Sequence, residues 1–109
     1  MEEKYSIIFS KKALYDLKMI HNYISIKLKE PQIAQNYTNK LVKQINILEY
    51  NPQWFNTINE RANRTDDIRI LILRKNLVFF KVYKIKKQVK ILRILNCNTN
   101  WIKIFRKYK

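Results

Sequence analysis

The spacing of apolar residues changes several times along the chain, and each change marks an expected boundary between elements. Residues 4–9 alternate, with Tyr5, Ile7 and Phe9 on one side, which predicts a first strand. Ser10 is a favourable N-cap, and the apolar residues after it recur at spacings of three and four. This pattern predicts an amphipathic helix of about five turns. Its apolar positions are Leu14, Leu17, Ile20, Ile24 and Leu28.

A second helical pattern follows a short break at Glu30 and Pro31. Proline suits the first turn of a helix, where a backbone N–H has no partner within the helix. The apolar positions of this helix are Ile33 or Ala34, Tyr37, Leu41, Ile45 and Leu48, and Asn51 with Pro52 ends it. Two long helices joined by so short a break form an antiparallel hairpin.

The second half of the chain predicts a loop, three strands and a short helix. Residues 53–67 are polar and irregular, and in this loop Trp54 and Phe55 are either core anchors or an interface patch. Three apolar strands are expected next, at residues 68–73, 77–83 and 89–95. Asn76 is the expected positive-φ residue of the first turn, since the chain has no glycine. The tail helix is expected to use Trp101, Ile104, Phe105 and Tyr108.

This order of elements predicts an α+β fold in one domain, residues 1–109. An N-terminal strand precedes the two-helix antiparallel hairpin. A three-stranded antiparallel meander then completes one small sheet, and a short C-terminal helix follows. The helix pair should pack on one face of the sheet, which leaves the other face partly open.

Positive charge is concentrated in the second half of the chain. Residues 1–60 carry eight Lys/Arg and six Asp/Glu, a net charge of +2, whereas residues 61–109 carry fifteen Lys/Arg and two Asp, a net charge of +13. Self-repulsion of this size opposes compaction, so folding does not require it. We therefore expect a polyanionic partner, either RNA, DNA or a strongly acidic protein. The alternative is a basic surface that is merely solvated, but this does not account for the difference in net charge between the two halves of the chain.

Composition excludes several classes of function. Without glycine the chain has no glycine-rich phosphate loop, which excludes Walker-type and Rossmann-type nucleotide enzymes. No apolar run approaches the roughly 18 residues of a membrane span, and the N-terminus does not resemble a signal peptide. Cys97 is the only cysteine, which suits a reducing cytoplasm. His21 is the only histidine, so we expect no metal and no cofactor.

Two stretches resemble the RelE/ParE superfamily of toxins from type II toxin–antitoxin systems. The first runs from Ile7 to Pro52 and is similar to the helical hairpin of the ParE-type subgroup. The second contains the Arg69 strand, the strand Asn-Leu-Val-Phe-Phe-Lys-Val from Asn76, and the strand Val-Lys-Ile-Leu-Arg-Ile-Leu before Asn96. Ribonuclease members often carry His or Tyr at the position of Asn96, followed by a basic turn. Here the turn 97–100 is uncharged.

The resemblance implies a candidate site. Ribonuclease members cleave ribosome-bound mRNA by directing the RNA 2′-hydroxyl at the phosphate, which requires cations and a proton donor. By motif position Arg69 and Arg93 are the catalytic candidates. The candidates for binding RNA or phosphate are Arg74, Lys75, Lys81 and Asn96. Tyr83, Tyr108 or a lysine would have to donate the proton. Alternatively, Arg69 and Arg93 have no catalytic role and either project to solvent or pair with Asp66 or Asp67.

Three functions remain open at this point, and we expect the first, with the other two as alternatives. The first is a toxin that cleaves mRNA on the ribosome as an endoribonuclease. The second is a ParE-like toxin that inhibits DNA gyrase by binding it, without cleavage by the toxin. The third is a basic binding module without catalytic activity. In each case the resemblance implies an acidic cognate antitoxin as partner, with no membrane and no small-molecule substrate.

Overall fold

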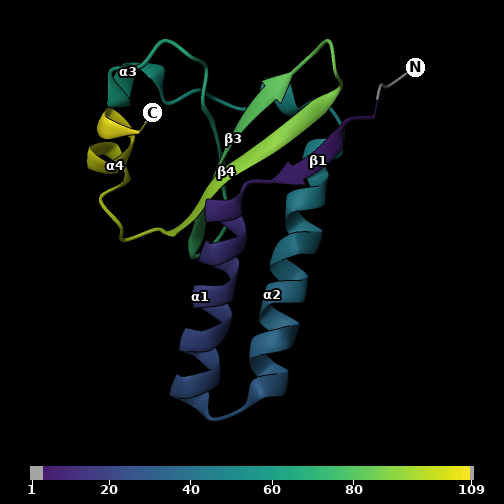
Figure 1. The fold of residues 1–109 in the computed structure, drawn as a ribbon, viewed down its shortest axis with the longest axis vertical. Coiled ribbons are helices and arrows are strands. Elements are labelled where there is room, and N and C mark those ends of the chain that lie inside the picture. Colours follow the sequence, from purple (N-terminus) through teal and green to yellow (C-terminus); the bar gives the residue numbers. More distant parts are fainter. Residues whose placement is uncertain (1–3, 109) are drawn as a thin grey trace.

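The computed structural model describes residues 4–108, in which the elements follow the predicted order (Figure 1). Strand β1 (Ser6–Phe9) leads directly into helix α1 (Lys11–Leu28). Ser10 caps this helix as expected, because its hydroxyl accepts the N–H of Ala13 (3.0 Å). Helix α2 (Pro31–Ile45) begins at the predicted proline and returns beside α1. The antiparallel helical hairpin is therefore confirmed.

The buried face of the hairpin differs slightly from the predicted one. Leu14 and Leu28 are 54% and 49% exposed, whereas Ala13 and Asp16 are buried. The hairpin extends well past the sheet, so the far ends of both helices have no strand to cover (Figure 1). The periodicity of α1 identifies a helix, but which side is buried depends on where the sheet ends.

The sheet has four strands in the order β1-β4-β3-β2. Strands β2 (Arg69–Ile72), β3 (Asn76–Tyr83) and β4 (Gln88–Asn96) form the predicted antiparallel meander, and β1 pairs parallel to β4. The prediction that Asn76 has positive φ was wrong. Asn76 is the first residue of β3, opposite Asn96, and its amide donates to the Tyr37 hydroxyl (2.6 Å).

One face of the sheet, which we call the hairpin face, packs against α1 and α2. Its buried strand residues are Leu71, Val78, Phe80, Val89, Ile91 and Ile94. The helices contribute Ala13, Leu41 and Ile45 to the same core. This arrangement is the one that the sequence predicts for an apolar stripe on each helix.

The opposite face of the sheet, which we call the α4 face, is covered over part of its area. Part of the cover comes from residues 53–67, which are more ordered than the irregular loop that the sequence predicts. That segment contains a 3₁₀ turn (Pro52–Trp54) and a one-turn helix, α3 (Asn59–Ala62). Helices α3 and α4 (Trp101–Lys107) lie together on this face (Figure 1). The second core that they close contains Ile58, Ala62, Ile68, Leu77, Phe79, Leu92, Leu95, Trp101 and Phe105.

Candidate functional site

Side chains from α1 complete the edge of β4 where β1 ends. Strand β1 ends at Phe9, so the rest of β4 has no neighbouring strand on that side. There the Ser10 hydroxyl donates to the Leu92 carbonyl (3.0 Å), and Asp16 Oδ2 accepts the N–H of Ile94 (2.9 Å). Because a buried backbone group without a partner is costly, Asp16 has a structural role at this edge.

The same carboxylate holds Arg93. The Nε of Arg93 lies 2.8 Å from Asp16 Oδ2 and its Nη2 lies 3.0 Å from Oδ1, which makes a bidentate pair. The hydrogen bond to Asp16 raises the pKa of Arg93 above its ordinary value. We expected Arg93 to lie at a phosphate, to project to solvent, or to pair with Asp66 or Asp67. Its partner is instead a residue 77 positions earlier in the chain.

The strand register places the two candidate catalytic arginines on opposite faces of the sheet. Arg69 lies opposite Phe80, and Arg93 lies opposite Phe79 across a β-bulge. Directly opposed residues of antiparallel strands share a face, and these two phenylalanines belong to different cores. Arg69 donates to the Phe55 carbonyl (2.6 Å). Arg69 and Arg93 therefore do not point toward a common phosphate.

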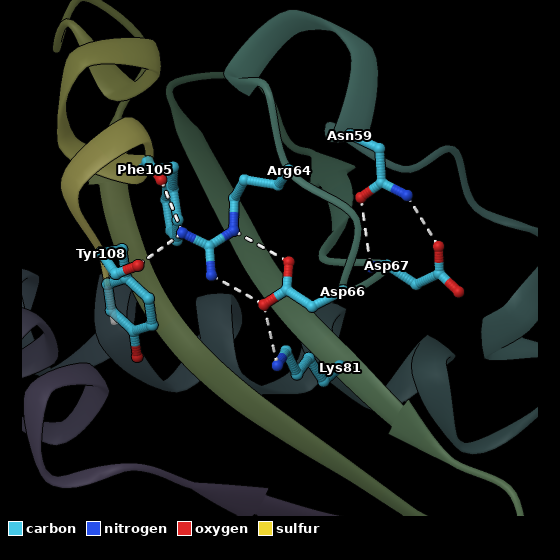
Figure 2. Close-up of polar contacts among 7 residues, drawn as sticks. All are labelled: Asn59, Arg64, Asp66, Asp67, Lys81, Phe105 and Tyr108. Carbon is cyan, nitrogen blue, oxygen red and sulfur yellow. Dashed lines mark hydrogen bonds and ion pairs between the residues drawn. The ribbon is translucent and has the colours of Figure 1, made fainter.

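Arg64, which our sequence analysis did not identify, is the centre of a polar cluster at the end of α4 (Figure 2). Its Nε and Nη2 donate to the Asp66 carboxylate at 2.9 and 2.7 Å. Its Nη1 donates to the carbonyls of Phe105 and Tyr108 at 2.6 and 2.5 Å. Lys81 Nζ lies 2.9 Å from the same Asp66 carboxylate. These contacts fasten the C-terminal helix to the segment before β2 and to β3.

The cluster sets the charge state of its members. Hydrogen bonds from Arg64, and then from Lys81, hold the pKa of Asp66 well below its ordinary value. The hydrogen bond to Asp66 also raises the pKa of Arg64. Lys81, a predicted phosphate-binding residue, thus has a carboxylate as its partner.

Neither aspartate pairs with Arg69 among residues 4–108. Asp66 is bound to Arg64, while Asp67 accepts a hydrogen bond from the Asn59 amide (2.7 Å) and donates its own N–H to that side chain (3.1 Å). The alternative that Arg69 forms an ion pair there does not hold in this structure.

The other three phosphate-binding candidates come together at the end of the sheet where β2 turns into β3. Arg74 and Lys75 lie in the turn, and Asn96 is opposite the first residue of β3. The Lys75 carbonyl accepts the N–H of Cys97 (2.9 Å), which holds the turn against the end of β4. A cleft of about 340 Å³ beside this turn is also lined by Lys40 of α2, a cation that the sequence analysis missed.

The structure does not assemble an acid–base pair from the expected residues. Asn96 is exposed, its Oδ1 accepts the N–H of Asn98 (2.9 Å), and a side-chain amide does not act as a general acid or base near neutral pH. Tyr83 is 41% exposed at the end of β3, and Tyr108 stacks against Phe105 at 5.1 Å between ring centroids. Within residues 4–108 no group of His, Cys, Asp and Glu side chains is arranged to hold a metal ion. No helix in that range has the length and apolarity to cross a bilayer.

Large exposed apolar side chains form a line on α1. They are Tyr15, Met19, Tyr23 and Ile26, which are 62%, 48%, 63% and 77% exposed. Spacings of four, four and three residues place them on one side of a helix, and we call this line the α1 stripe. The two aromatic residues of the predicted loop behave differently from each other. Trp54 is 77% exposed, whereas Phe55 packs edge-on against Phe80.

Comparison with known proteins identifies the family. A sequence model described as "ParE toxin of type II toxin-antitoxin system, parDE" matches residues 7–101, nearly the whole chain. The chain belongs to this ParE toxin family. Comparison with curated proteins gave no significant match.

The fold of this ParE-family toxin is also similar to a solved structure, described as "Chromosomal ParDE TA system from P. aeruginosa". The TM-score is 0.70 at 24% sequence identity, and the match covers 85% of this toxin and 96% of the other chain. At this identity the likeness concerns the fold alone, and it agrees with the predicted α+β arrangement. Family membership makes the chain the toxin component of a type II system, whose other component is an antitoxin.

Proposed function

We propose that the toxin arrests growth by binding DNA gyrase through the α1 stripe, without cleaving RNA itself. The observation that carries this proposal is the line of four large apolar side chains exposed along α1. Contiguous exposed apolar surface marks protein-binding sites, and tyrosine is enriched at the residues that dominate binding energy. Gyrase is the target that the resemblance to ParE-type toxins implies.

The chemistry of the α1 stripe supports a protein target for the hairpin. The hairpin, residues 11–45, carries seven lysines and two acidic residues, a net charge of +5, whereas residues 61–109 carry +13. A surface of tyrosine, methionine and isoleucine gains affinity from burial and not from phosphate contacts. The α1 stripe therefore suits a folded protein partner better than a nucleic acid.

The state of the candidate catalytic residues argues against cleavage. Arg93 is bound by Asp16, and Arg69 is bound by a backbone carbonyl on the other face of the sheet. Asn96 occupies the position of the expected proton-transferring side chain. Phosphodiester cleavage requires cations and a proton donor that converge on one phosphate, and these residues do not supply that arrangement.

A supercoiling assay with purified gyrase and purified toxin tests this proposal. We expect inhibition by the wild-type toxin and a loss of at least about tenfold in potency for Tyr23→Ala with Ile26→Ala, because central interface residues often contribute over 1 kcal/mol each. Ile33→Ala on α2 is the matched control, since Ile33 is also an exposed isoleucine of the hairpin but lies outside the stripe. It should inhibit like the wild type.

Mapping of mRNA 5′ ends on ribosomes after brief induction in bacteria distinguishes the alternative. The proposal predicts growth arrest without new cuts, and Arg69→Ala should leave the arrest unchanged. Cuts at a fixed position within codons that disappear in Arg69→Ala would establish the ribonuclease function instead. For this test Arg69 is preferable to Arg93, because removing Arg93 would leave Asp16 without its partner.

We infer further that the cognate antitoxin covers the toxin with an acidic segment that orders on binding. A chain of net charge +15 attracts an acidic partner over long range, and such attraction weakens as salt is added. The association rate should therefore fall steeply with ionic strength. A rate that is insensitive to salt would contradict an acidic binding segment.

A further inference from the structure

We propose that the turn between β3 and β4 contacts duplex DNA, with Ile85 inserted between base pairs and with Lys84 and Lys86 on the flanking phosphates. We call these three residues the basic tip. The proposal concerns a surface separate from the α1 stripe and does not depend on gyrase being the target.

Ile85 has no structural role that would explain its identity. Its side chain is 99% exposed, the highest value among the large hydrophobic residues that the structure describes. It contributes to neither core, and turns favour glycine, proline, asparagine, aspartate and serine over a β-branched apolar residue. An apolar side chain held fully in water at the end of a hairpin is suited to an apolar partner.

The backbone holds this turn in one shape. The Lys87 N–H donates to the Lys84 carbonyl (3.3 Å), and Lys87 adopts the left-handed region with φ of 53°. The Lys87 carbonyl accepts the N–H of Ser6 in the neighbouring strand (2.8 Å), and the Lys87 ammonium lies 5.4 Å from the ring centroid of Tyr5. Because the turn is fixed in advance, Ile85 can be presented without a large loss of entropy on binding.

The two flanking lysines keep their charge available. Lys84 and Lys86 are exposed, and neither forms an ion pair with a carboxylate of residues 4–108. Lys84 borders a hollow that contains Asp66 and Asp67, but Asp66 is engaged by Arg64 and Lys81 and Asp67 by Asn59 (Figure 2). The tip therefore presents a cation on each side of an exposed apolar side chain.

The position of the tip permits contact with an extended partner. The β3–β4 turn lies at the end of the long axis opposite to the turn between α1 and α2 (Figure 1). The molecule measures 43 × 36 × 23 Å, so the tip and the far end of the hairpin can be occupied together. A toxin bound to a protein through α1 would leave the basic tip free.

Duplex DNA is the partner whose chemistry matches this arrangement. Proteins that bend DNA insert apolar side chains between base steps in the minor groove, and cations beside the insertion neutralise the phosphates. An acidic peptide would satisfy the lysines but gives Ile85 no stacked apolar surface. The excess positive charge of residues 61–109, which a hairpin contact with gyrase leaves unexplained, also suits a duplex.

Binding of the purified toxin to a short duplex labelled with two fluorophores tests the insertion. Anisotropy reports affinity, and energy transfer between the duplex ends reports bending. We expect Ile85→Ser to return the duplex close to its unbent end-to-end distance while the salt dependence of binding stays unchanged. Ile72→Ser is the matched control, because Ile72 is 71% exposed on the edge strand β2, away from the tip. It should bend DNA like the wild type.

A pair of charge variants tests the phosphate contacts. Lys84→Gln with Lys86→Gln should reduce the slope of log K against log salt by about 1.8, since each phosphate contact contributes about 0.9. Lys18→Gln with Lys43→Gln removes the same charge from the helical hairpin, where both lysines are exposed, and should leave the slope unchanged. Equal losses in both pairs would overturn the proposal in favour of diffuse attraction. Competition by polyglutamate as strong as that by unlabelled duplex would assign the tip to an acidic protein.

Discussion

At the scale of single residues, the contact between Arg93 and Asp16 matters most for interpreting the sheet. The exposed fractions of these side chains are only 21% and 9%, so solvent does little to screen their interaction. Asp16 also accepts a backbone N–H of β4. The pair therefore links the start of α1 to the centre of the sheet, and a residue that the family motif marks as catalytic has a structural partner here.

Replacing Arg93 by alanine should destabilise the toxin by about 3 kcal/mol, because it leaves a largely buried carboxylate without its counter-charge. Urea unfolding of the purified protein measures this loss. Adding Asp16→Asn to Arg93→Ala should restore part of the stability, since the amide removes the charge but its oxygen still accepts the Ile94 N–H. Arg74→Ala, an exposed residue, is the control and should change stability by under about 0.5 kcal/mol. A loss in Arg93→Ala no larger than the control would contradict a structural role.

The Asp66 carboxylate gives the molecule a specific response to acid. Its pKa is lowered in the folded state by hydrogen bonds from Arg64, whereas an unfolded aspartate titrates near about 3.9. A depressed folded pKa means that the contribution to stability is complete above the unfolded value and is lost as pH falls below it. The tie between α4 and the rest of the chain should therefore weaken below about pH 4.

Asp66→Asn tests this dependence. At neutral pH the variant should be less stable by about 1–3 kcal/mol, the range for hydrogen bonds to charged groups, and the difference from wild type should shrink below about pH 4. Asp67→Asn is the matched control, because Asp67 contacts only the neutral Asn59 amide among residues 4–108. Urea unfolding between neutral pH and strong acid gives both curves. A difference that persists unchanged in acid would show that the Asp66 charge does not stabilise the fold.

At the scale of elements, the local sequence pattern predicted most helix and strand boundaries. It failed where contacts between residues far apart in the chain determine the local structure. The strand expected at 77–83 is Asn76–Tyr83, because a short apolar run is a local signal of a buried strand. Helix α3 was missed, since its four residues are stabilised by burial of Ala62 against the distant α4. Asn76 was expected at positive φ and does not adopt it; Asn51 and Asn63 do, but so do Lys29, Asp67 and Lys87.

The same distinction applies to the candidate site. The resemblance of two stretches to known toxins was sufficient to indicate the superfamily and to mark Arg69 and Arg93 as candidates. They did not indicate Arg64, whose backbone acceptors lie 41 and 44 residues away, or the Asp16 partner of Arg93, 77 residues away. A polar residue in an irregular segment gives no periodic signal, so only the packing of α4 over the sheet shows its role.

Burial of Phe105 should account for much of the hold of α4 on the sheet. Its side chain is fully buried, with its ring centroid 4.5 Å from that of Phe79 and an additional contact to Tyr108. We expect Phe105→Ala to reduce the free energy of unfolding by about 3–5 kcal/mol, through lost burial and the cavity left behind. Lys103→Ala on the exposed side of the same helix should have little effect. A loss below about 1 kcal/mol would show that α4 detaches readily from this face.

At the scale of the whole molecule, two surfaces of different chemistry are separated along one axis. The helical hairpin presents the exposed apolar side chains of the α1 stripe, whereas the sheet, its turns and α4 hold most of the cations. This separation would let the proposed contacts with gyrase and with DNA form without competition between them. It also means that positive charges crowd within a single sheet layer, where they repel one another.

Added salt should therefore stabilise the isolated toxin. At about 0.01 M salt the Debye length of about 30 Å is comparable to the molecule, which measures 43 × 36 × 23 Å, so nearly all of its excess cations interact. At about 0.15 M the length falls to about 8 Å and only close neighbours still repel. We expect the melting temperature to rise by about 5 °C, equivalent to about 1 kcal/mol, when sodium chloride is raised over this range.

Thermal unfolding followed by circular dichroism measures this shift, and variants of lower charge identify its source. Lys84→Gln with Lys86→Gln removes two positive charges that have no ion-pair partner among residues 4–108, so this variant should start from a higher melting temperature and gain less from salt. Asp66→Asn should instead gain more, because it removes one of the few negative charges within the basic half. A melting temperature that falls with salt would mean that attraction in the Asp16 and Asp66 ion pairs outweighs the repulsion among the unpaired cations.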